Sequence, residues 1–182
     1  PQQAPDDYRC FILEWPHQNT QFVTGFNAVP GNLQVVHHVA AYLMPPDTPL
    51  GEDLRTTVMG WDEADDGPGY ECFGGPSGGE EDLAVPIQQL AQWVPGMAGI
   101  DFPQDTGIQV KPGSLLVLQV HYNTASAGPQ PDQTSVQFSL APEVAHRAAF
   151  APWLGLDWVL GSMRIPAGEK DVVYVAEDDP RP

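Results

Sequence analysis

Short apolar runs separated by turn residues make up most of this chain of 182 residues. The strongest run is Ser114–Tyr122, SLLVLQVHY, and a second, Val35–Leu43, stops before Pro45 and Pro46. Runs of this length, bounded by glycine and proline, are typical of β-strands. The other segments expected to form strands are Cys10–Trp15, Gln21–Phe26, Ile108–Val110, Val136–Leu140 and Val172–Val175. The pattern predicts an all-β fold, an antiparallel β-sandwich that is jelly-roll-like.

Several stretches do not follow the strand pattern. Residues 45–82 are polar, acidic and glycine-rich, and no capped helical period is evident in them, so a long loop is expected. Residues 85–93, VPIQQLAQW, are expected to form a short helix or an irregular crossing segment. Phe150–Val159 is rich in aromatic residues, and Ile165–Gly168 is expected to turn. No internal repeat is found, so the length predicts one domain, with or without a tail.

The composition limits the partners of the chain. Its 24 acidic and 7 basic residues give a net charge of −17, which disfavours nucleic acid and anionic membranes as partners. The acidity favours a role in solubility, and the alternative is an acidic face that attracts cationic partners or metal ions. No apolar run is long enough to span a bilayer. The start, PQQAPDDY, does not resemble a signal peptide, so a secreted form is expected to be a mature or trimmed chain.

Cys10 and Cys72 are the two cysteines of the chain. They are far apart and lack the C-x-x-C spacing of a thioredoxin-like motif or a zinc ribbon. They form either one disulfide that closes a long loop or two buried thiols. The sequence slightly favours the disulfide, because Cys72 lies within the long loop expected over residues 45–82. A disulfide would indicate an oxidising compartment.

Three of the five histidines lie in the two strongest predicted strands. His37 and His38 are adjacent in one strand, and His121 lies in the other. Whether these strands pair in one sheet or lie in facing sheets, the three imidazoles can converge on a site that suits zinc or copper. The alternatives are a hydrogen-bonded scaffold or solvent on one face of the strand. His17 and His146 stand in polar surroundings and are expected at the surface.

Two motifs resemble a known family. VVHHVAAYL and LLVLQVHYNT resemble the two copper motifs in the amino-terminal domain of the type II, ascorbate-dependent copper monooxygenases. This family includes the peptidylglycine α-hydroxylating and dopamine β-monooxygenases and bacterial relatives, and the chain is most similar to the bacterial type. The segments that follow the family's order, from about Asp6 to about Val175, are DDYRCFILEW, VTGFNAVPGN, GYECFGGP, QWVPG, GIQVKPGS and RIPAGEKDVV.

The resemblance implies a fold, a site and a role. It implies a jelly-roll-like β-sandwich that binds one copper ion per chain through His37, His38 and His121. In the family this copper stores and delivers an electron, with a reductant such as ascorbate. The resemblance also implies a disulfide between Cys10 and Cys72 and a secreted or periplasmic, extracytoplasmic location.

The sequence also departs from the family. Family enzymes have a second domain whose copper is held by a His-x-His pair and a methionine, and oxygen is activated there. This sequence contains no His-x-His, so residues 1–175 are expected to form the copper domain and residues 176–182 a tail or a linker to a missing second domain. The chain alone is then expected to be inactive as a monooxygenase. Two alternatives stay open: a secreted single-domain copper-binding or copper-carrier protein, and a β-sandwich interaction module whose histidines only form hydrogen bonds.

Overall fold

Two β-sheets and one helix form the larger of two units in the described parts of the chain, Pro1–Phe150 and Ala151–Pro182. This computed structural model describes residues 5–47, 51–77, 87–150, 161, 163–175 and 177. In chain order the elements are β1 (Asp6–Glu14), β2 (Gln21–Val29), β3 (Val36–Met44), α1 (Gly51–Ala64), β4 (Tyr70–Glu71), β5 (Gln88–Trp93), β6 (Ile100–Asp101), β7 (Thr106–Val110), β8 (Leu115–Asn123), β9 (Ser135–Ala141) and β10 (His146–Ala148). The predicted all-β, sandwich-like fold is confirmed.

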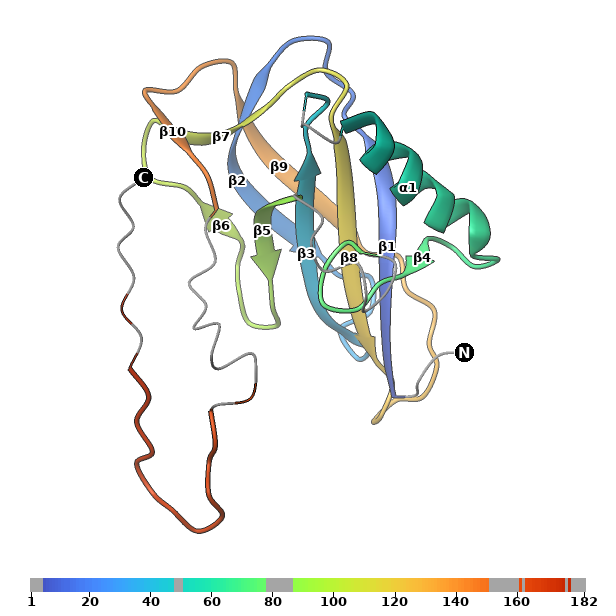
Figure 1. Ribbon diagram of the computed structural model, residues 1–182, viewed down its shortest axis with the longest axis vertical. Coiled ribbons are helices and arrows are strands. Elements are labelled where there is room, and N and C mark those ends of the chain that lie inside the picture. Colours follow the sequence, from blue (N-terminus) through green and yellow to red (C-terminus); the bar gives the residue numbers. More distant parts are fainter. Residues whose placement is uncertain are drawn as a thin grey trace. The chain divides into compact units, whose positions relative to one another are not determined.

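Strand β8 lies at the centre of the first sheet. That sheet runs β4-β1-β8-β3-β5, and the second runs β10-β7-β2-β6, with β9 also paired to β2 (Figure 1). β8 is antiparallel to both of its long neighbours, β1 and β3. Among the described strands β10 pairs with β7 in parallel, so the second sheet is mixed. The central place of β8 brings side chains from three strands to one face of the first sheet.

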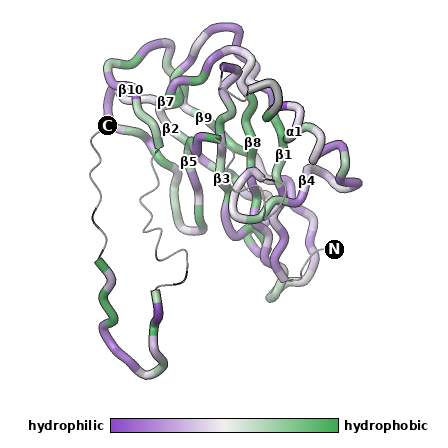
Figure 2. The backbone as a smooth tube through the Cα atoms, viewed as in Figure 1, coloured by the Kyte–Doolittle hydropathy of each residue, from purple (hydrophilic) through white to green (hydrophobic). Residues whose placement is uncertain are grey.

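The main hydrophobic core lies between the two sheets. Alternate residues of a strand point to opposite faces, and Leu116, Leu118 and Val120 of β8 point into this core. Hydrophobic positions run along the strands of both sheets (Figure 2). The buried members of the core are Trp15, Val23, Phe26, Ala28, Val36, Val39, Ala41, Leu43, Leu90, Ala91, Trp93, Ile108, Val110, Leu116, Leu118 and Val120. The intervening residues of β8, which include Gln119 and His121, point to the outer face of the sheet.

Helix α1 covers part of that outer face and lies beside β1 (Figure 1). The loop expected over residues 45–82 is therefore wrong in part, because it contains α1 and β4. Leu54, Val58 and Trp61 recur at helical spacing and form one apolar stripe within an acidic segment. A second buried cluster joins this stripe to the sheet through Cys10, Met44, Leu54, Val58, Tyr70, Cys72, Leu115 and Val117. In the described parts of the chain, no helix has both the length and the apolar character needed to cross a membrane.

The expectation for residues 85–93 is also wrong. Residues 88–93 form a strand antiparallel to β3 instead of a short helix or an irregular segment. The ladder shifts register between Ala41 and Tyr42, so two consecutive residues of β5, Leu90 and Ala91, are both buried. This irregularity removes the alternation of apolar and polar residues by which a strand is recognised in a sequence.

The smaller unit contains the expected turn but not the expected strand. The Glu169 N–H donates to the Pro166 carbonyl at 3.2 Å, within the turn predicted at Ile165–Gly168. Val172–Val175 forms no strand, so the expectation of a strand there is wrong. Phe150–Val159 lies outside the described residues except for Phe150. The domain boundary expected at residue 175 stays a prediction.

Candidate metal centre

The pairing of β3 with β8 brings two histidines together. His38 of β3 is opposite His121 of β8 in the antiparallel register. The two strands therefore pair within one sheet and do not face each other from different sheets. On the other side of β8, Tyr8 of β1 is also opposite His121. The central strand thus presents His121 between a histidine and a tyrosine.

A register shift in β3 explains how two adjacent histidines share one site. Neighbouring residues of a regular strand point to opposite faces. The ladder of β3 passes directly from Val36 to His38, so His37 is the extra residue of an irregularity of the β-bulge kind. The centroid of the His37 ring lies 4.7 Å from that of His121 and 5.8 Å from that of His38. The irregularity therefore turns His37 toward the face that His38 already occupies.

The three predicted ligands form one cluster. One ring nitrogen from each of His37, His38 and His121 lies within 4.8 Å of the others. The exposed fraction of His121 is 6%, whereas His38 is partly buried and His37 is exposed. The cluster is thus buried on the side of His121 and open to solvent on the side of His37.

A carboxylate fixes the protonation of His121. Its Nε2 lies 2.9 Å from Asp6 Oδ1, which also accepts a hydrogen bond of 2.7 Å from Asn123 Nδ2. A carboxylate can only accept, so the hydrogen of the neutral His121 ring lies on Nε2. The other ring nitrogen, Nδ1, then carries a lone pair and can bind a metal.

A buried amide fixes the protonation of His38 in the same way. Gln119, with 3% of its surface exposed, donates from Nε2 to the carbonyl groups of Cys72 at 3.2 Å and Gly75 at 3.0 Å. These two acceptors determine which end of the amide is the nitrogen. Its oxygen therefore faces His38 Nε2 at 3.3 Å and accepts a hydrogen bond from it. The Nδ1 atom of His38 is left as the unprotonated nitrogen.

The two unprotonated nitrogens face each other. His38 Nδ1 and His121 Nδ1 are 3.3 Å apart, and neither has a hydrogen to donate. Two lone pairs at this distance repel each other unless a positive charge lies near both. The arrangement therefore fits a metal ion that binds imidazole, a group that suits copper and zinc.

Burial keeps the two inner histidines neutral. It lowers the pKa of His38 and of His121, while the hydrogen bonds with Gln119 and Asp6 act in the opposite direction. The pKa of Asp6 is itself lowered, first by the hydrogen bond from His121 and then by the one from Asn123. At neutral pH the rings of His38 and His121 are thus neutral, the form in which histidine binds a metal, and they lie beside an ionised carboxylate.

Aromatic side chains cover one side of the cluster. The ring of Tyr8 stacks on that of His121, with centroids 3.9 Å apart and an angle of 7° between the planes. Phe73 packs edge-on against Tyr8 at 5.1 Å and is 58% exposed. Burial raises the pKa of the Tyr8 hydroxyl, so the side chain that covers the His121 ring is neutral.

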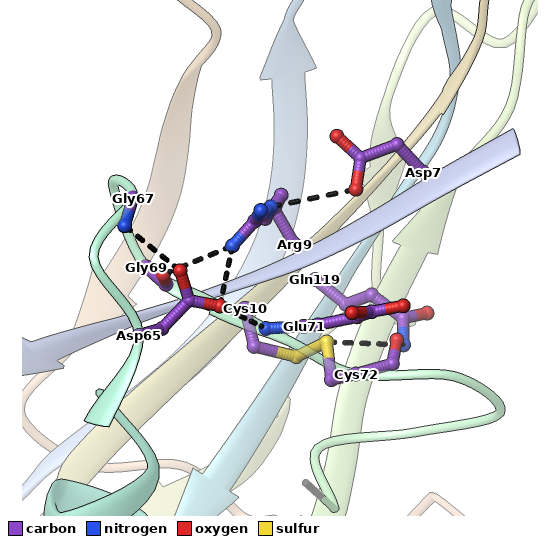
Figure 3. Close-up of polar contacts among 9 residues, drawn as sticks. All are labelled: Asp7, Arg9, Cys10, Asp65, Gly67, Gly69, Glu71, Cys72 and Gln119. Atoms are coloured by element: carbon purple, nitrogen blue, oxygen red, sulfur yellow. Dashed lines mark hydrogen bonds and ion pairs between the residues drawn. A yellow bond between two sulfur atoms is a disulfide. The ribbon is translucent and has the colours of Figure 1, made fainter. Parts of the chain in front are cut away.

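A disulfide supports the residues that hold the cluster. Cys10 of β1 and Cys72, after β4, are bonded to each other and buried (Figure 3). The bond that the resemblance implied is therefore present. It fixes the segment whose Cys72 and Gly75 carbonyl groups orient Gln119. Because Gln119 accepts a hydrogen bond from His38, the disulfide also helps to hold the His38 ring in place.

An ion pair anchors the same segment at its start. Arg9 Nη1 donates to Asp65 Oδ2 at 2.7 Å and to the Gly69 carbonyl at 3.3 Å (Figure 3). Asp65 also accepts from the backbone N–H of Gly67 at 2.8 Å, and Arg9 Nε lies 3.4 Å from Asp7. The turn after α1 is thereby held against β1, the strand that carries Asp6 and Tyr8.

Sequence reasoning missed the supporting residues of the site. Gln119 stands two positions before His121 and so shares its face of β8, which was a usable signal. Asp6 and Tyr8 could be found only by knowing that β1 pairs with β8. The remaining histidines lie outside the cluster: His17 is partly buried against Trp15 at 5.1 Å, and His146 is exposed.

The sequence matches a model of a known protein family. The family model for the N-terminal domain of the copper type II ascorbate-dependent monooxygenases matches residues 1–128. This span contains the three clustered histidines and both cysteines. No curated protein matches the chain.

Proposed function

The chain belongs to the copper type II ascorbate-dependent monooxygenases, through their N-terminal domain, and on this premise we propose that it holds one copper ion at His37, His38 and His121. Copper bound there supplies one-electron chemistry by cycling between Cu(II) and Cu(I). The domain stores the electron, and ascorbate is the reductant that provides it.

One observation carries the proposal, the approach of His38 Nδ1 to His121 Nδ1 at 3.3 Å. Both rings already use their Nε2 hydrogens in other bonds, so a shared cation is the simplest partner for the two lone pairs. The Irving–Williams order favours Cu(II) over Zn(II) at imidazole sites. Neutral imidazoles also suit Cu(I), so the same ligands serve both oxidation states.

The residues around the cluster have separate tasks. Gln119 and Asp6 hold the His38 and His121 rings with Nδ1 turned inward. Tyr8 covers the His121 ring and keeps water from that side. The exposed His37 leaves one side open, where a small reductant or a partner domain can approach.

Hydroxylation is proposed to need a second copper domain. Within the described residues the three histidines form the one group that could hold a metal. We therefore expect no coupled oxygen consumption and product formation from this chain with copper and ascorbate alone. The Cys10–Cys72 bond supports a secreted or periplasmic location, because disulfides persist in oxidising compartments.

The test is the copper content of the dialysed protein, measured by mass spectrometry of the metal, together with its electron paramagnetic resonance (EPR) spectrum. The unaltered chain is expected to retain one copper per chain, with a Cu(II) signal that ascorbate removes. His121→Ala is expected to lose tight binding, and His146→Ala, the matched control, to keep it. One copper per chain in His121→Ala, or loss of copper from His146→Ala, contradicts the assignment.

The exposure of His37 favours one alternative, a secreted copper carrier, because a ligand at the surface can be exchanged readily. A carrier releases copper to an acceptor, whereas an electron store keeps it through many cycles. Repeated reduction by ascorbate and reoxidation by air, in the presence of a Cu(I) chelator, separates the two roles. Retention of copper supports the electron store, and transfer to the chelator on the first reduction supports the carrier.

A further inference from the structure

Asp6 has a defined place beside the cluster. In the register of β1 with β8, Asp6 is opposite Asn123 and Tyr8 is opposite His121. The Asp6 carboxylate lies 2.9 Å from His121 Nε2 and accepts a hydrogen bond of 2.7 Å from Asn123. Asn123 thus holds the carboxylate in position, and the carboxylate holds the ring.

The two inner ligands differ in the charge of their partners. His121 donates to an anion, whereas His38 donates to the neutral amide of Gln119. A carboxylate draws the imidazole hydrogen toward itself and raises the electron density on the opposite nitrogen. Such outer partners orient a ligand and strengthen it as a donor. A stronger donor favours the more highly charged ion of a redox pair.

We propose that Asp6 is a positioning residue that keeps His121 in its Nε2–H form and lowers the reduction potential of the copper couple. This inference rests on the proposed function. The effect on the Nε2–H form and the effect on the reduction potential can be tested separately. An asparagine at position 6 can still accept the hydrogen bond but carries no charge, whereas an alanine removes both the acceptor and the charge.

The first experiment measures the midpoint potential and the copper affinities of Asp6→Asn. Loss of the charge is expected to weaken Cu(II) binding about tenfold relative to Cu(I). For a one-electron couple this corresponds to a rise in potential of about 59 mV. Asp7→Asn is the matched control, since it removes the same charge from the next residue. Asp7 acts on His121 through space and is paired with Arg9, so a clearly smaller rise is expected.

The second experiment needs no metal. The ¹⁵N shifts of the His121 ring in the copper-free protein report which nitrogen carries the hydrogen. The unaltered chain and Asp6→Asn are expected to show the Nε2–H form, and Asp6→Ala a mixture of both forms. Circular dichroism of each variant verifies that the fold is kept.

The two experiments test different parts of the proposal. An unchanged potential in Asp6→Asn, or an equal rise in Asp7→Asn, overturns the effect on potential. A pure Nε2–H form in Asp6→Ala overturns the positioning role. If the unaltered chain binds no copper, the proposed function and the effect on potential both fail, and the ¹⁵N shifts still decide whether Asp6 positions His121.

Discussion

Gln119 and His38 are joined by a hydrogen bond of 3.3 Å although 81 residues separate them in the chain. The same amide donates to the carbonyl of Cys72, so the disulfide-bonded segment and the candidate ligand share one side chain. Long-range support of a ligand in this way makes the site sensitive to changes that touch no histidine.

Replacing Gln119 with alanine is expected to weaken copper binding by about 10- to 100-fold, the usual range for the loss of a ligand's hydrogen-bond partner. The His38 ring would lose the acceptor that fixes its orientation. A competition titration against a copper chelator gives the affinity. Gln92→Ala, on the exposed side of β5, is the control and should bind as the unaltered chain does. Equal affinity in the two variants would falsify this role for Gln119.

Removing the disulfide is expected to lower the free energy of unfolding by about 4 kcal/mol, the chain-entropy value for a loop of this size. Cys10 and Cys72 close a loop of sequence separation 62. The double variant Cys10→Ser, Cys72→Ser avoids a lone thiol, and urea unfolding of the copper-free protein measures the change. The same urea midpoint with and without a reducing agent in the unaltered chain would contradict the prediction.

Asp65 is expected to give a stability that depends on pH. Its pKa is lowered, first by the hydrogen bond from the Gly67 N–H and then by Arg9. A carboxyl group with a lower pKa in the folded chain stabilises above its unfolded pKa of about 3.9. This stability is lost as the pH falls through the folded pKa. Asp65→Asn should therefore unfold at lower urea than the unaltered chain at pH 7, and the difference should shrink in acid.

The control for this prediction is Asp66→Asn, which removes the same charge from the adjacent residue. It tests whether the effect belongs to the contacts of Asp65 or to the net charge of −17. A less negative net charge reduces self-repulsion and should not destabilise the fold, so an equal loss of stability in the two variants at pH 7 would contradict a role for the Asp65 contacts.

The apolar stripe of α1 is expected to stabilise the fold against the outer face of the sheet. Leu54→Ala removes a side chain that is 7% exposed and should cost about 2–5 kcal/mol, as buried leucines do. Met59, on the same helix, is 40% exposed, so Met59→Ala should change stability by no more than about 0.5 kcal/mol. Thermal unfolding compares the two. Equal melting temperatures would mean that the helix does not pack as described.

The sequence predicted those parts of the molecule that depend on local patterns. The apolar runs around His38 and His121 identified β3 and β8, and three histidines within such runs identified the cluster. The residues that hold the rings depend on pairing between distant strands. Asp6 reaches His121 only because β1 lies beside β8, and no local pattern reports that neighbour.

The errors also have physical reasons. Helix α1 was missed because its apolar stripe is narrow and its surroundings are acidic, so composition outweighed spacing. Strand β5 was missed because the register shift buries Leu90 and Ala91 together. The strand expected at Val172–Val175 was predicted from β-branched residues alone, although a strand also needs a neighbour.

The register of β3 with β8 determines which ligand can adjust. From His38–His121 to Met44–Leu115 the two strands are paired residue by residue. The ladder fixes the backbone positions of His38 and His121, and Gln119 and Asp6 hold their rings, so these two histidines form the less adjustable part of the cluster. His37 lies at the irregularity, has no partner in this ladder and is exposed. If the proposed copper ion binds here, His37 could move toward it or away from it, as its charge changes, without disturbing the sheet.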